Sequence, residues 1–357
     1  MVVSQKVILA LSGGVDSAIA AYYLKRDGCD VLGVYFDFWK HKPVEDSVVK
    51  TRIKNAAEKI GIPLLILDRK DYFYKSVIEP FILGLESGET PNPCVQCNPL
   101  VKFRLLSEIA EKEGAQFIAT GHYARVIYHD ENGYELYQGV DKTKDQSYVL
   151  AYLDQEILSK LILPLGNSYK SENILIANKS GLDAYISKES QDLCFVDSSQ
   201  YKHFVMESVE KWTKSGPIFD FEGNKLGEHG GLIQYTIGQR KGIRISAPEP
   251  YYVARKDLSR NALIVGKLTE LGLDHFYTQD IQWINKEPVF PLTCDVKIRY
   301  RAKPVMCTVN MKDGTSAEVK TFIDIKDLTP GQYAVFLEGE RVLGAGRITE
   351  VGSRDHI

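Results

Sequence analysis

The sequence predicts an α/β protein: a doubly wound parallel sheet, then a small central module, then an antiparallel β-barrel. In the first half of the chain, short apolar runs alternate with helical patterns, which is typical of a parallel sheet with helices on both faces. From about Trp212 onward, Gly-rich turns separate short β-type runs, which is typical of antiparallel β structure. At 357 residues the chain is long enough for two or three domains.

The elements of the first half follow in order. Apolar runs predict strands over 6–11, 30–36, 63–67 and 116–122, and helical patterns lie between them over 16–28, 47–61 and 100–114. Ligands bind such sheets at the carboxyl ends of the strands. The segment SGGVDS, the start of the loop after residue 36, and TGH all lie at such ends.

The second half is predicted to divide into two parts. A central module contains the Gly-rich segment 216–242, and the tail repeats β-type runs over 294–300, 306–311, 317–322, 333–339 and 341–348. We expect a first domain over 1–205, a central module over 206–277 and a barrel over 278–357.

The composition describes a soluble globular protein, with 44% hydrophobic and 25% charged residues. No apolar run is long enough to span a bilayer, and the start of the chain has no signal-peptide layout. We therefore expect a cytoplasmic protein without a membrane partner, whose six cysteines stay mostly reduced. Because the net charge is −3, nucleic-acid binding requires local basic patches.

The segment LALSGGVDSAIAAYYL joins a strand to a helix through a Ser-Gly-Gly turn. Gly13 and Gly14 let backbone N–H groups close around a pyrophosphate, while Ser12 and Ser17 add hydroxyl donors. The helix N-terminus also favours an anion. The Walker A and dinucleotide patterns both fail here. An ordinary β-turn-α joint with Asp16 as a helix cap is the alternative.

The string SGGVDS after an N-terminal strand resembles the PP-loop of the ATP pyrophosphatase family, whose fold is adenine nucleotide α-hydrolase-like. The resemblance implies cleavage of ATP, with Mg²⁺, between the α- and β-phosphates and adenylation of an acceptor. It places Gly121 against the adenosine and the Phe36 backbone beside the adenine; the expected ATP-binding residues are Ala10, Leu11, Ser12, Gly13, Gly14, Val15, Asp16, Ser17, Phe36 and Gly121. A strand-end turn is the alternative role for Gly121 and His122.

The stretch TPNPCVQCNPLVKF holds Cys94 and Cys97 in a polar turn just ahead of a helix. A C-x-x-C can be half of a zinc site, a redox pair, a cluster ligand set or a catalytic centre. No second C-x-x-C or His pair completes a zinc site, and a thioredoxin-like pair lacks its sheet context. Cys29, Cys294 and Cys307 lie in apolar or strand contexts and are expected to be structural.

Further strings make the resemblance more specific. NPCVQCN, TGHYAR, KDQSY and SQDLCFV follow one another in the order found in tRNA-specific 2-thiouridylases, and HGGLIQYTIGQRKG, KIRYR and TPGQYAVF in the tail agree. The resemblance covers nearly the whole chain. It implies ATP-dependent 2-thiolation of the wobble uridine of tRNA, with sulfur supplied by a persulfide or sulfide donor protein.

In that family the cysteines matching Cys97 and Cys194 are the catalytic thiol and the persulfide carrier, and Asp192 would orient the adenylated base. A Cys97–Cys194 disulfide would remain for reduction. The familiar bacterial motif has an acidic residue where this chain has Cys94. Cys94, Cys97 and Cys194 are therefore also candidate ligands of a [4Fe–4S] cluster, and both sulfur routes stay open. Asp192 as a simple turn cap is the alternative.

RNA contacts are expected on several segments. The resemblance puts Asn92, Pro93, Cys94 and Lys144, Asp145 and Gln146 near the RNA, although a loop or helix cap is the usual role of such residues. If DVKIRYRAKP is one strand, one of its faces is basic and consists of Lys297, Arg299, Arg301 and Lys303. This face is either a solvated surface or an RNA contact, and the expected contact residues are Arg299 and Tyr300. Arg240, Lys241 and Arg244 form a second patch.

Two other functions remain open. A PP-loop synthetase or amidotransferase with a small acceptor would need an ammonia source, and no N-terminal catalytic cysteine is present. The other is a non-enzymatic RNA-binding protein with an inactive nucleotide loop, which loss of thiolation in Cys97→Ser and Asp16→Ala variants, with RNA binding kept, would exclude.

Overall fold

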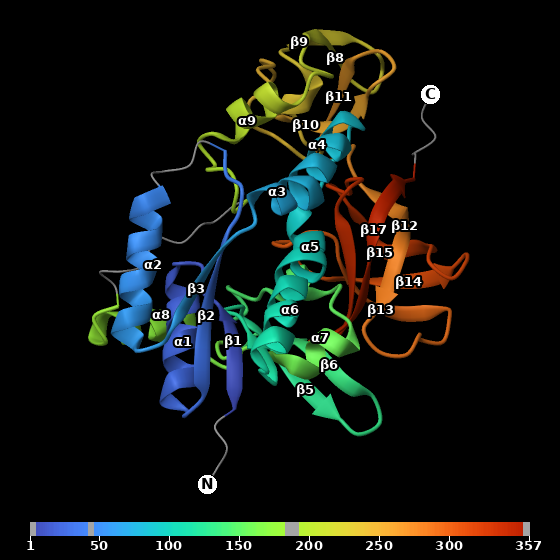
Figure 1. Ribbon diagram of the computed structural model, residues 1–357. Coiled ribbons are helices and arrows are strands. Elements are labelled where there is room, and N and C mark those ends of the chain that lie inside the picture. The colour runs from blue at the N-terminus through green and yellow to red at the C-terminus, as the bar shows by residue number, and fades with distance from the viewer. Residues whose placement is uncertain (1–4, 42–45, 183–192, 353–357) are drawn as a thin grey trace.

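The computed structural model describes residues 5–41, 46–182 and 193–352 (Figure 1). Three sheets organise the chain: a five-stranded parallel sheet, a four-stranded sheet and an eight-stranded antiparallel sheet. Figure 1 shows the first three strands of the parallel sheet in blue, the small sheet at the top, and the strands from residue 273 onward in orange and red. The predicted fold class is confirmed, with a parallel sheet first and a closed antiparallel barrel last.

The parallel sheet has the strand order β3-β2-β1-β4-β7. Its strands are β1 (Lys6–Ala10), β2 (Asp30–Asp37), β3 (Leu64–Asp68), β4 (Phe117–Ala119) and β7 (Leu161–Ile162). Every pairing in it is parallel. Side chains alternate across a strand, so Val7 and Leu9 enter one apolar cluster and Ile8 enters the other. Because both faces are covered, the strand reads as one continuous apolar run.

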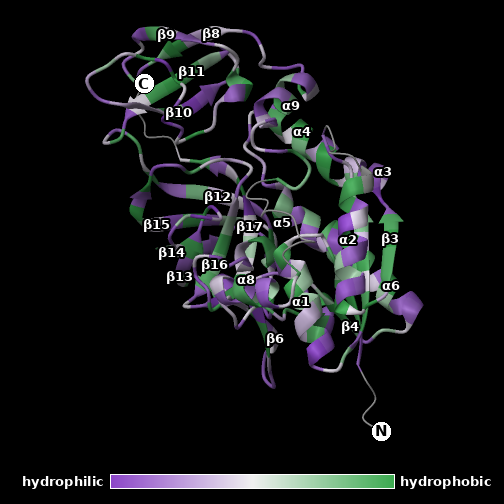
Figure 2. Ribbon diagram, turned by 90° about the vertical axis from the view of Figure 1, so that its left-hand side faces the viewer, coloured by the Kyte–Doolittle hydropathy of each residue, from purple (hydrophilic) through white to green (hydrophobic). Residues whose placement is uncertain are grey.

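Helices cover the two faces of this sheet. α1 (Val15–Arg26), α2 (Asp46–Ile60) and α8 (Lys170–Lys179) lie with Val7 and Leu9, whereas α6 (Arg104–Glu113) packs with Ile8. In Figure 2, β3 is coloured as mostly hydrophobic while α2 beside it mixes hydrophilic and hydrophobic residues, as expected for a helix with one buried face.

A helical region connects β3 to β4. It comprises α3 (Lys70–Phe73), the π-helical turn η1 (Tyr74–Ile78), α4 (Glu79–Glu86), α5 (Pro93–Cys97), the π-helical turn η2 (Asn98–Phe103) and α6. Two expectations are corrected here. The C-x-x-C lies inside α5 and not in a turn, because the Asn92 side chain accepts a bond from the Cys94 N–H at 3.3 Å and starts a helix. The helix expected over 100–114 begins as a π-helical turn.

Three further short elements complete this part of the chain. η3 (Ser147–Leu150) and α7 (Gln155–Lys160) precede β7, and α9 (Tyr201–Ser208) leads into the central module. The central module is a four-stranded sheet of order β10-β11-β8-β9, with strands β8 (Gly216–Phe219), β9 (Lys225–His229), β10 (Tyr251–Asp257) and β11 (Ala262–Lys267), and the turn η5 (Leu232–Gln234). Its own apolar cluster contains Ile218, Val253 and Leu263.

The barrel consists of β12 (Leu273–Trp283), β13 (Leu292–Lys297), β14 (Val305–Met311), β15 (Ala317–Ile325), β16 (Tyr333–Glu338) and β17 (Arg341–Val351). Pairing of β12 with β17 closes it. A hairpin from the first half of the chain, β5 (Ala124–His129) and β6 (Gly133–Gln138), extends the same sheet through Val342 opposite Leu136. The sequence patterns did not reveal this pairing. The three expected domain ranges stay predictions.

The expected basic strand face over 295–304 is wrong. β13 ends at Lys297, and a turn follows in which the Ala302 N–H donates to the Arg299 carbonyl at 3.0 Å. Lys297 and Arg299 are half-buried, whereas Arg301 and Lys303 are exposed. Alternation along a strand cannot apply across a turn, so these cations do not form one face.

Within the described ranges, no helix combines the length and apolar character needed to cross a bilayer.

Candidate active site

The predicted phosphate loop connects β1 to α1. Gly13 has a φ of +83°, and a Cβ there would lie 2.8 Å from Ile53, so the turn favours glycine. Gly14 is the N-cap of α1, and no described side chain caps it. The first amides of α1 therefore stay available to an anion, as expected for a helix N-terminus that binds phosphate. These residues fit the polyphosphate of ATP.

Hydroxyl groups hold the shape of this loop. The Ser17 hydroxyl donates to the Gly14 carbonyl at 2.9 Å and accepts from the Ser12 N–H at 3.1 Å. The Ser12 side chain is exposed, while Ala10, Leu11, Val15 and Ser17 are buried or half-buried. Of the predicted loop residues, Ser12 thus offers a side-chain hydroxyl to a ligand, and the others contribute backbone and shape.

Asp16 does not act as a simple helix cap. Lys170 on α8 donates to both of its carboxylate oxygens at 2.6 and 2.7 Å, and the Tyr123 hydroxyl donates to Oδ1 at 2.9 Å. Asn173 on α8 in turn donates to the Tyr123 hydroxyl at 2.9 Å. Burial and the nearby Asp16 charge raise the pKa of Tyr123, so its hydroxyl stays a donor. The network ties α8 to the nucleotide loop.

Gly121 lies directly against the start of α1. A Cβ at Gly121 would lie 2.7 Å from the Asp16 carbonyl carbon and 2.8 Å from the Ser17 nitrogen. Backbone atoms cannot move aside as a side chain can, so this close approach requires glycine. The next residue, His122, bonds through Nδ1 to the Thr120 hydroxyl at 2.7 Å. The His122 ring also lies 6.1 Å from that of Phe103, so this segment joins the loop before α1 to the helical turn that follows Cys97.

The three candidate cysteines are close enough for their charges to interact. The pKa of Cys97 is raised to about 12, chiefly by burial and further by Cys194 and Cys94, while Lys102 lowers it. The pKa of Cys94 is raised to about 11, by burial first and then by Cys194. Cys194 reaches solvent, yet the protein atoms around its sulfur desolvate the thiol and raise its pKa, which Lys102 and Lys40 lower. In this state all three groups are thiols near neutral pH.

Lys102 is the cation that all three thiols share. Its ammonium group donates to Asn98 Oδ1 at 3.0 Å, and Asn98 donates to the Val149 carbonyl at 2.7 Å. Asn98 and Lys102 both lie in η2, the π-helical turn after Cys97. Such turns often occur at functional sites. Burial, followed by the Lys102 charge, holds the pKa of His122 well below its usual value. His122 is therefore a neutral imidazole.

The spacing of the thiols bears on which metal they could bind. Ligands of one tetrahedral zinc ion at a Zn–S distance of about 2.3 Å lie about 3.8 Å apart. Among the described residues, no group of three possible ligands within 4.8 Å includes these cysteines. They are not arranged for a single zinc ion. An iron–sulfur cluster separates its thiolates more widely, so the donor set remains compatible with one.

The structure locates the other expected residues as follows. Phe36 is buried at the end of β2 and stacks on Phe38 with ring centroids 5.5 Å apart. Asp192 lies outside the described residues. Cys294 and Cys307 are buried as expected, and Cys29 is half-buried.

The residues expected to contact RNA have structural partners. Asp145 is buried and accepts from the Gly139 and Ser147 N–H groups, each at 3.1 Å. Gln146 Oε1 accepts from the Tyr123 N–H at 3.0 Å. Arg299 donates to the Ile237 carbonyl at 3.1 Å and to the Thr329 hydroxyl. Their contact with RNA stays a prediction.

The other candidates for RNA contact differ in exposure. Lys144, Asn92 and Tyr300 are half-buried, Pro93 is buried, and Arg240, Lys241 and Arg244 are exposed.

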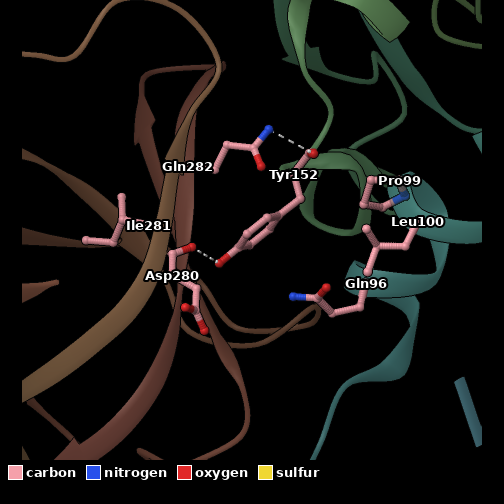
Figure 3. A pocket seen from close by; sticks show the side chains of 7 residues that line it. All are labelled: Gln96, Pro99, Leu100, Tyr152, Asp280, Ile281 and Gln282. Carbon is pink, nitrogen blue, oxygen red and sulfur yellow. Dashed lines mark hydrogen bonds between the residues drawn. The ribbon is translucent and has the colours of Figure 1, made fainter. Parts of the chain in front are cut away.

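A cavity of about 480 Å³ lies beside α5 (Figure 3). Gln96, between the two cysteines of α5, lies on one side and Asp280 on the other, and the Tyr152 side chain extends toward Asp280. The Tyr152 hydroxyl donates to the Asp280 carbonyl at 2.7 Å. This volume lies within the range of about 300–1,000 Å³ usual for small-ligand pockets. Pro99, Leu100, Ile281 and Gln282 complete the lining.

Sequence reasoning missed Lys102, Tyr123 and Lys170. Lys102 lies in the quoted cysteine stretch, four residues after Asn98, and that helical spacing was the available signal. Lys170 lies far along the chain from Asp16, so only the fold pairs them.

Comparison with known proteins identifies the family. The tRNA-specific 2-thiouridylase MnmA of Natranaerobius thermophilus is 37% identical, over 99% of this chain and 100% of the relative. This chain belongs to the tRNA-specific 2-thiouridylase family. The family protein of Synechocystis sp. is 40% identical over 97% of each chain, and that of Rickettsia typhi is 39% identical over 96% of this chain and 98% of the relative.

Family profiles match three successive segments. The profile described as the tRNA methyl transferase HUP domain matches residues 5–198, its PRC-barrel domain matches 202–267, and the aminomethyltransferase beta-barrel domain matches 273–348. Among solved structures, the U34-tRNA thiolase NcsA of Methanococcus maripaludis, with its [4Fe-4S] cluster, is 19% identical with a TM-score of 0.34, covering 56% of this chain and 63% of its own. That likeness supports no further conclusion.

Proposed function

We propose that this chain uses ATP to replace the 2-oxygen of a uridine in tRNA, at the wobble position, by sulfur. The observation that carries the proposal is that Cys94, Cys97 and Cys194 share the influence of Lys102, which also acts on His122 beside Gly121, and Gly121 packs on the phosphate loop. A thiol group next to a nucleotide loop fits activation by ATP followed by attack of sulfur. Membership of the 2-thiouridylase family supports the same reaction.

The first step activates the uracil. Its 2-oxygen attacks the α-phosphorus of ATP, pyrophosphate leaves, and the oxygen becomes part of an adenylate leaving group. The α1 amides and Ser12 would hold the phosphates. Gly121, which packs against the start of α1, would lie beside the adenosine. Mg²⁺ would arrive bound to the phosphates of ATP and not through Asp16, because Lys170 already donates to both carboxylate oxygens of Asp16.

The second step delivers sulfur. The terminal sulfur of a Cys194 persulfide attacks carbon 2, its proton goes to solvent, and AMP leaves with the electron pair of the broken C–O bond. The Cys97 thiol then loses its proton to solvent and attacks Cys194 Sγ, and the breaking S–S bond leaves its electron pair on the transferred sulfur. A Cys97–Cys194 disulfide results, and an external thiol reductant restores both thiols. The exposure of Cys194 suits loading by a donor protein.

The alternative sulfur route uses Cys94, Cys97 and Cys194 as ligands of a [4Fe–4S] cluster. When bound, such a cluster would supply an iron that carries hydrosulfide. The burial of Cys94 and Cys97 favours neutral thiols, so cluster ligation would require their deprotonation.

The tRNA would lie across all three sheets. The exposed Arg240, Lys241 and Arg244 supply local positive charge in a chain whose net charge is −3. The cavity between Gln96 and Asp280 is a candidate place for an anticodon-loop base. Because the reaction needs tRNA and reduced thiols, we place it in the cytoplasm.

The proposal is tested with purified protein, ATP, a tRNA transcript and a persulfide donor. Mass spectrometry of digested nucleosides should detect 2-thiouridine in the wild type. Cys97→Ser should abolish it under both sulfur routes, with tRNA affinity retained. Thiolation in the Cys97→Ser variant, or none in the wild type with any donor, would contradict the proposal.

Control reactions separate the competing functions. One control tests methyl transfer, because the matching family profile is described as a tRNA methyl transferase domain. In this reaction labelled S-adenosylmethionine is supplied in place of ATP and the sulfur donor, and no labelled methyl group should appear in the tRNA. Consumption of ATP with small acceptors in the absence of tRNA would favour a synthetase. Binding of tRNA without any modification would favour a non-enzymatic protein.

The two sulfur routes differ in metal content and in Cys94. Anaerobically purified protein that is iron-free yet thiolates tRNA from a persulfide excludes the cluster. Cys94→Asp should keep activity under the persulfide route and lose it under the cluster route.

A further inference from the structure

A second group of possible metal ligands lies outside the thiol cluster. His41, in the segment after β2, meets His203 and Glu207 of α9, and one ligand atom from each lies within 4.8 Å of the others. His203 Nδ1 is 2.8 Å from Glu207 Oε2, and His41 Nε2 is 3.5 Å from the same oxygen. None of these residues has a role in the proposed thiolation chemistry.

The local fold holds the three side chains in position. His203 and Glu207 are four residues apart on α9 and therefore share one helix face. The His41 ring packs on Phe204 with centroids 5.2 Å apart. The backbone N–H of His41 also donates to the carbonyl of Phe195 at 2.8 Å, and Phe195 directly follows Cys194 in the chain. The site thus joins α9, the segment after β2 and the Cys194 segment.

His41 provides the observation that points to a ligand. Its Nε2 is buried, yet it makes no hydrogen bond to any described residue. A buried ring nitrogen without a hydrogen bond costs free energy unless another partner satisfies it. Its side chain is 11% exposed, whereas those of His203 and Glu207 are 51% and 49% exposed, so an ion can enter from solvent.

The spacing and donor types select the class of ion. Zinc binds imidazole nitrogen and carboxylate oxygen at about 2.0–2.2 Å, so tetrahedral ligand atoms lie about 3.3–3.6 Å apart. The 3.5 Å between His41 and Glu207 matches this spacing, and the 2.8 Å between His203 and Glu207 requires only a small opening. Two imidazoles with one carboxylate suit zinc better than the all-oxygen sites of calcium or magnesium.

We propose that His41, His203 and Glu207 bind one zinc-class divalent ion that fastens α9 to the segment after β2 and steadies the neighbouring Cys194 segment. Water completes the coordination. The ion is structural and takes no part in sulfur transfer, so its presence is independent of the proposed function.

The experiment uses untagged full-length protein and Co²⁺, whose visible absorption reports tetrahedral coordination. Thiolates also bind Co²⁺, so the titration is done in a Cys94→Ser, Cys97→Ser, Cys194→Ser background. We expect about one equivalent of Co²⁺ to bind without a thiolate charge-transfer band, Zn²⁺ to displace it, and Zn²⁺ to raise the Tm.

Matched variants locate the site. His203→Ala and, separately, Glu207→Gln should weaken binding at least about tenfold, as expected from losing one ligand. Because both positions are half-exposed, the metal-free Tm should change little, and circular dichroism checks the fold. His275→Ala, which removes another His–Glu pair of 3.0 Å with Glu318, should leave binding unchanged. Lack of Co²⁺ binding in the background protein, or binding that survives both His203→Ala and Glu207→Gln, would overturn the proposal and leave an ordinary His–Glu ion pair.

Discussion

Replacing Lys102 by methionine removes the cation that lowers the pKa of Cys94, Cys97 and Cys194 alike. A nearby opposite charge lowers a pKa by about 1–3 units. Lys102 is half-buried and partly screened by water, so we take the low end and expect the Cys97 pKa, already about 12, to rise by about one unit. Well below the pKa, the thiolate fraction then falls about tenfold. The alkylation rate falls about three- to fourfold, because the more basic thiolate is also the stronger nucleophile.

The assay measures iodoacetamide alkylation of Cys97 from pH 7 to about 9, the range around the ordinary cysteine pKa. Mass spectrometry follows the Cys97 peptide in a Cys94→Ser, Cys194→Ser background. Lys102→Arg is the matched control, since it keeps the charge and should react at nearly the wild-type rate. Equal rates for Lys102→Met and wild type, or an equally slow Lys102→Arg, would refute the electrostatic role. Melting curves confirm that loss of the bond to Asn98, 3.0 Å long, does not unfold the variants.

Three further predictions follow from the same structure. Gly121→Ala should abolish ATP binding measured by calorimetry and lower the free energy of unfolding by about 1–3 kcal/mol, because the added Cβ would lie 2.7 Å from the α1 backbone. Gly227 has open space around it, so Gly227→Ala should change neither ATP binding nor stability. His122 has a pKa well below its usual value, so the unfolded chain takes up a proton before the folded chain does as pH falls. The free energy of unfolding should therefore decrease below about pH 6.5, by at most about 1.4 kcal/mol per pH unit. In urea titrations His122→Gln should flatten this slope, and an unchanged slope would refute the assignment. Arg299→Ala should lower the free energy of unfolding by about 1–3 kcal/mol, because it loses the hydrogen bonds to Ile237 and Thr329. The exposed Arg240 should not affect stability, and Arg240→Ala should flatten the salt dependence of tRNA binding. An equal loss of stability in the two variants would contradict this distinction.

Much of the fold was predictable because its signals are local. The strand β1 reads as a continuous apolar run since both faces of the parallel sheet are covered, and its clusters on either side confirm that reading. The glycines of the phosphate loop were also predictable, because a φ of +83° at Gly13 favours that residue type. Local signals were insufficient where tertiary contacts decide. The π-helical turn at Asn98 forms around a bond to the distant Val149, and β13 ends at Lys297 although the alternating pattern continues.

The sequence by itself determined the order of the elements, the phosphate loop, the family resemblance and the identity of the candidate thiols. These properties depend on neighbouring residues, whose spacing is visible along the chain. Only the tertiary structure decided that Lys170 binds Asp16, that Lys102 faces three cysteines, and that His41 meets α9. Pairings between residues far apart in sequence depend on how the layers pack, and the electrostatics of a buried thiol depend on every charge that packing brings near it.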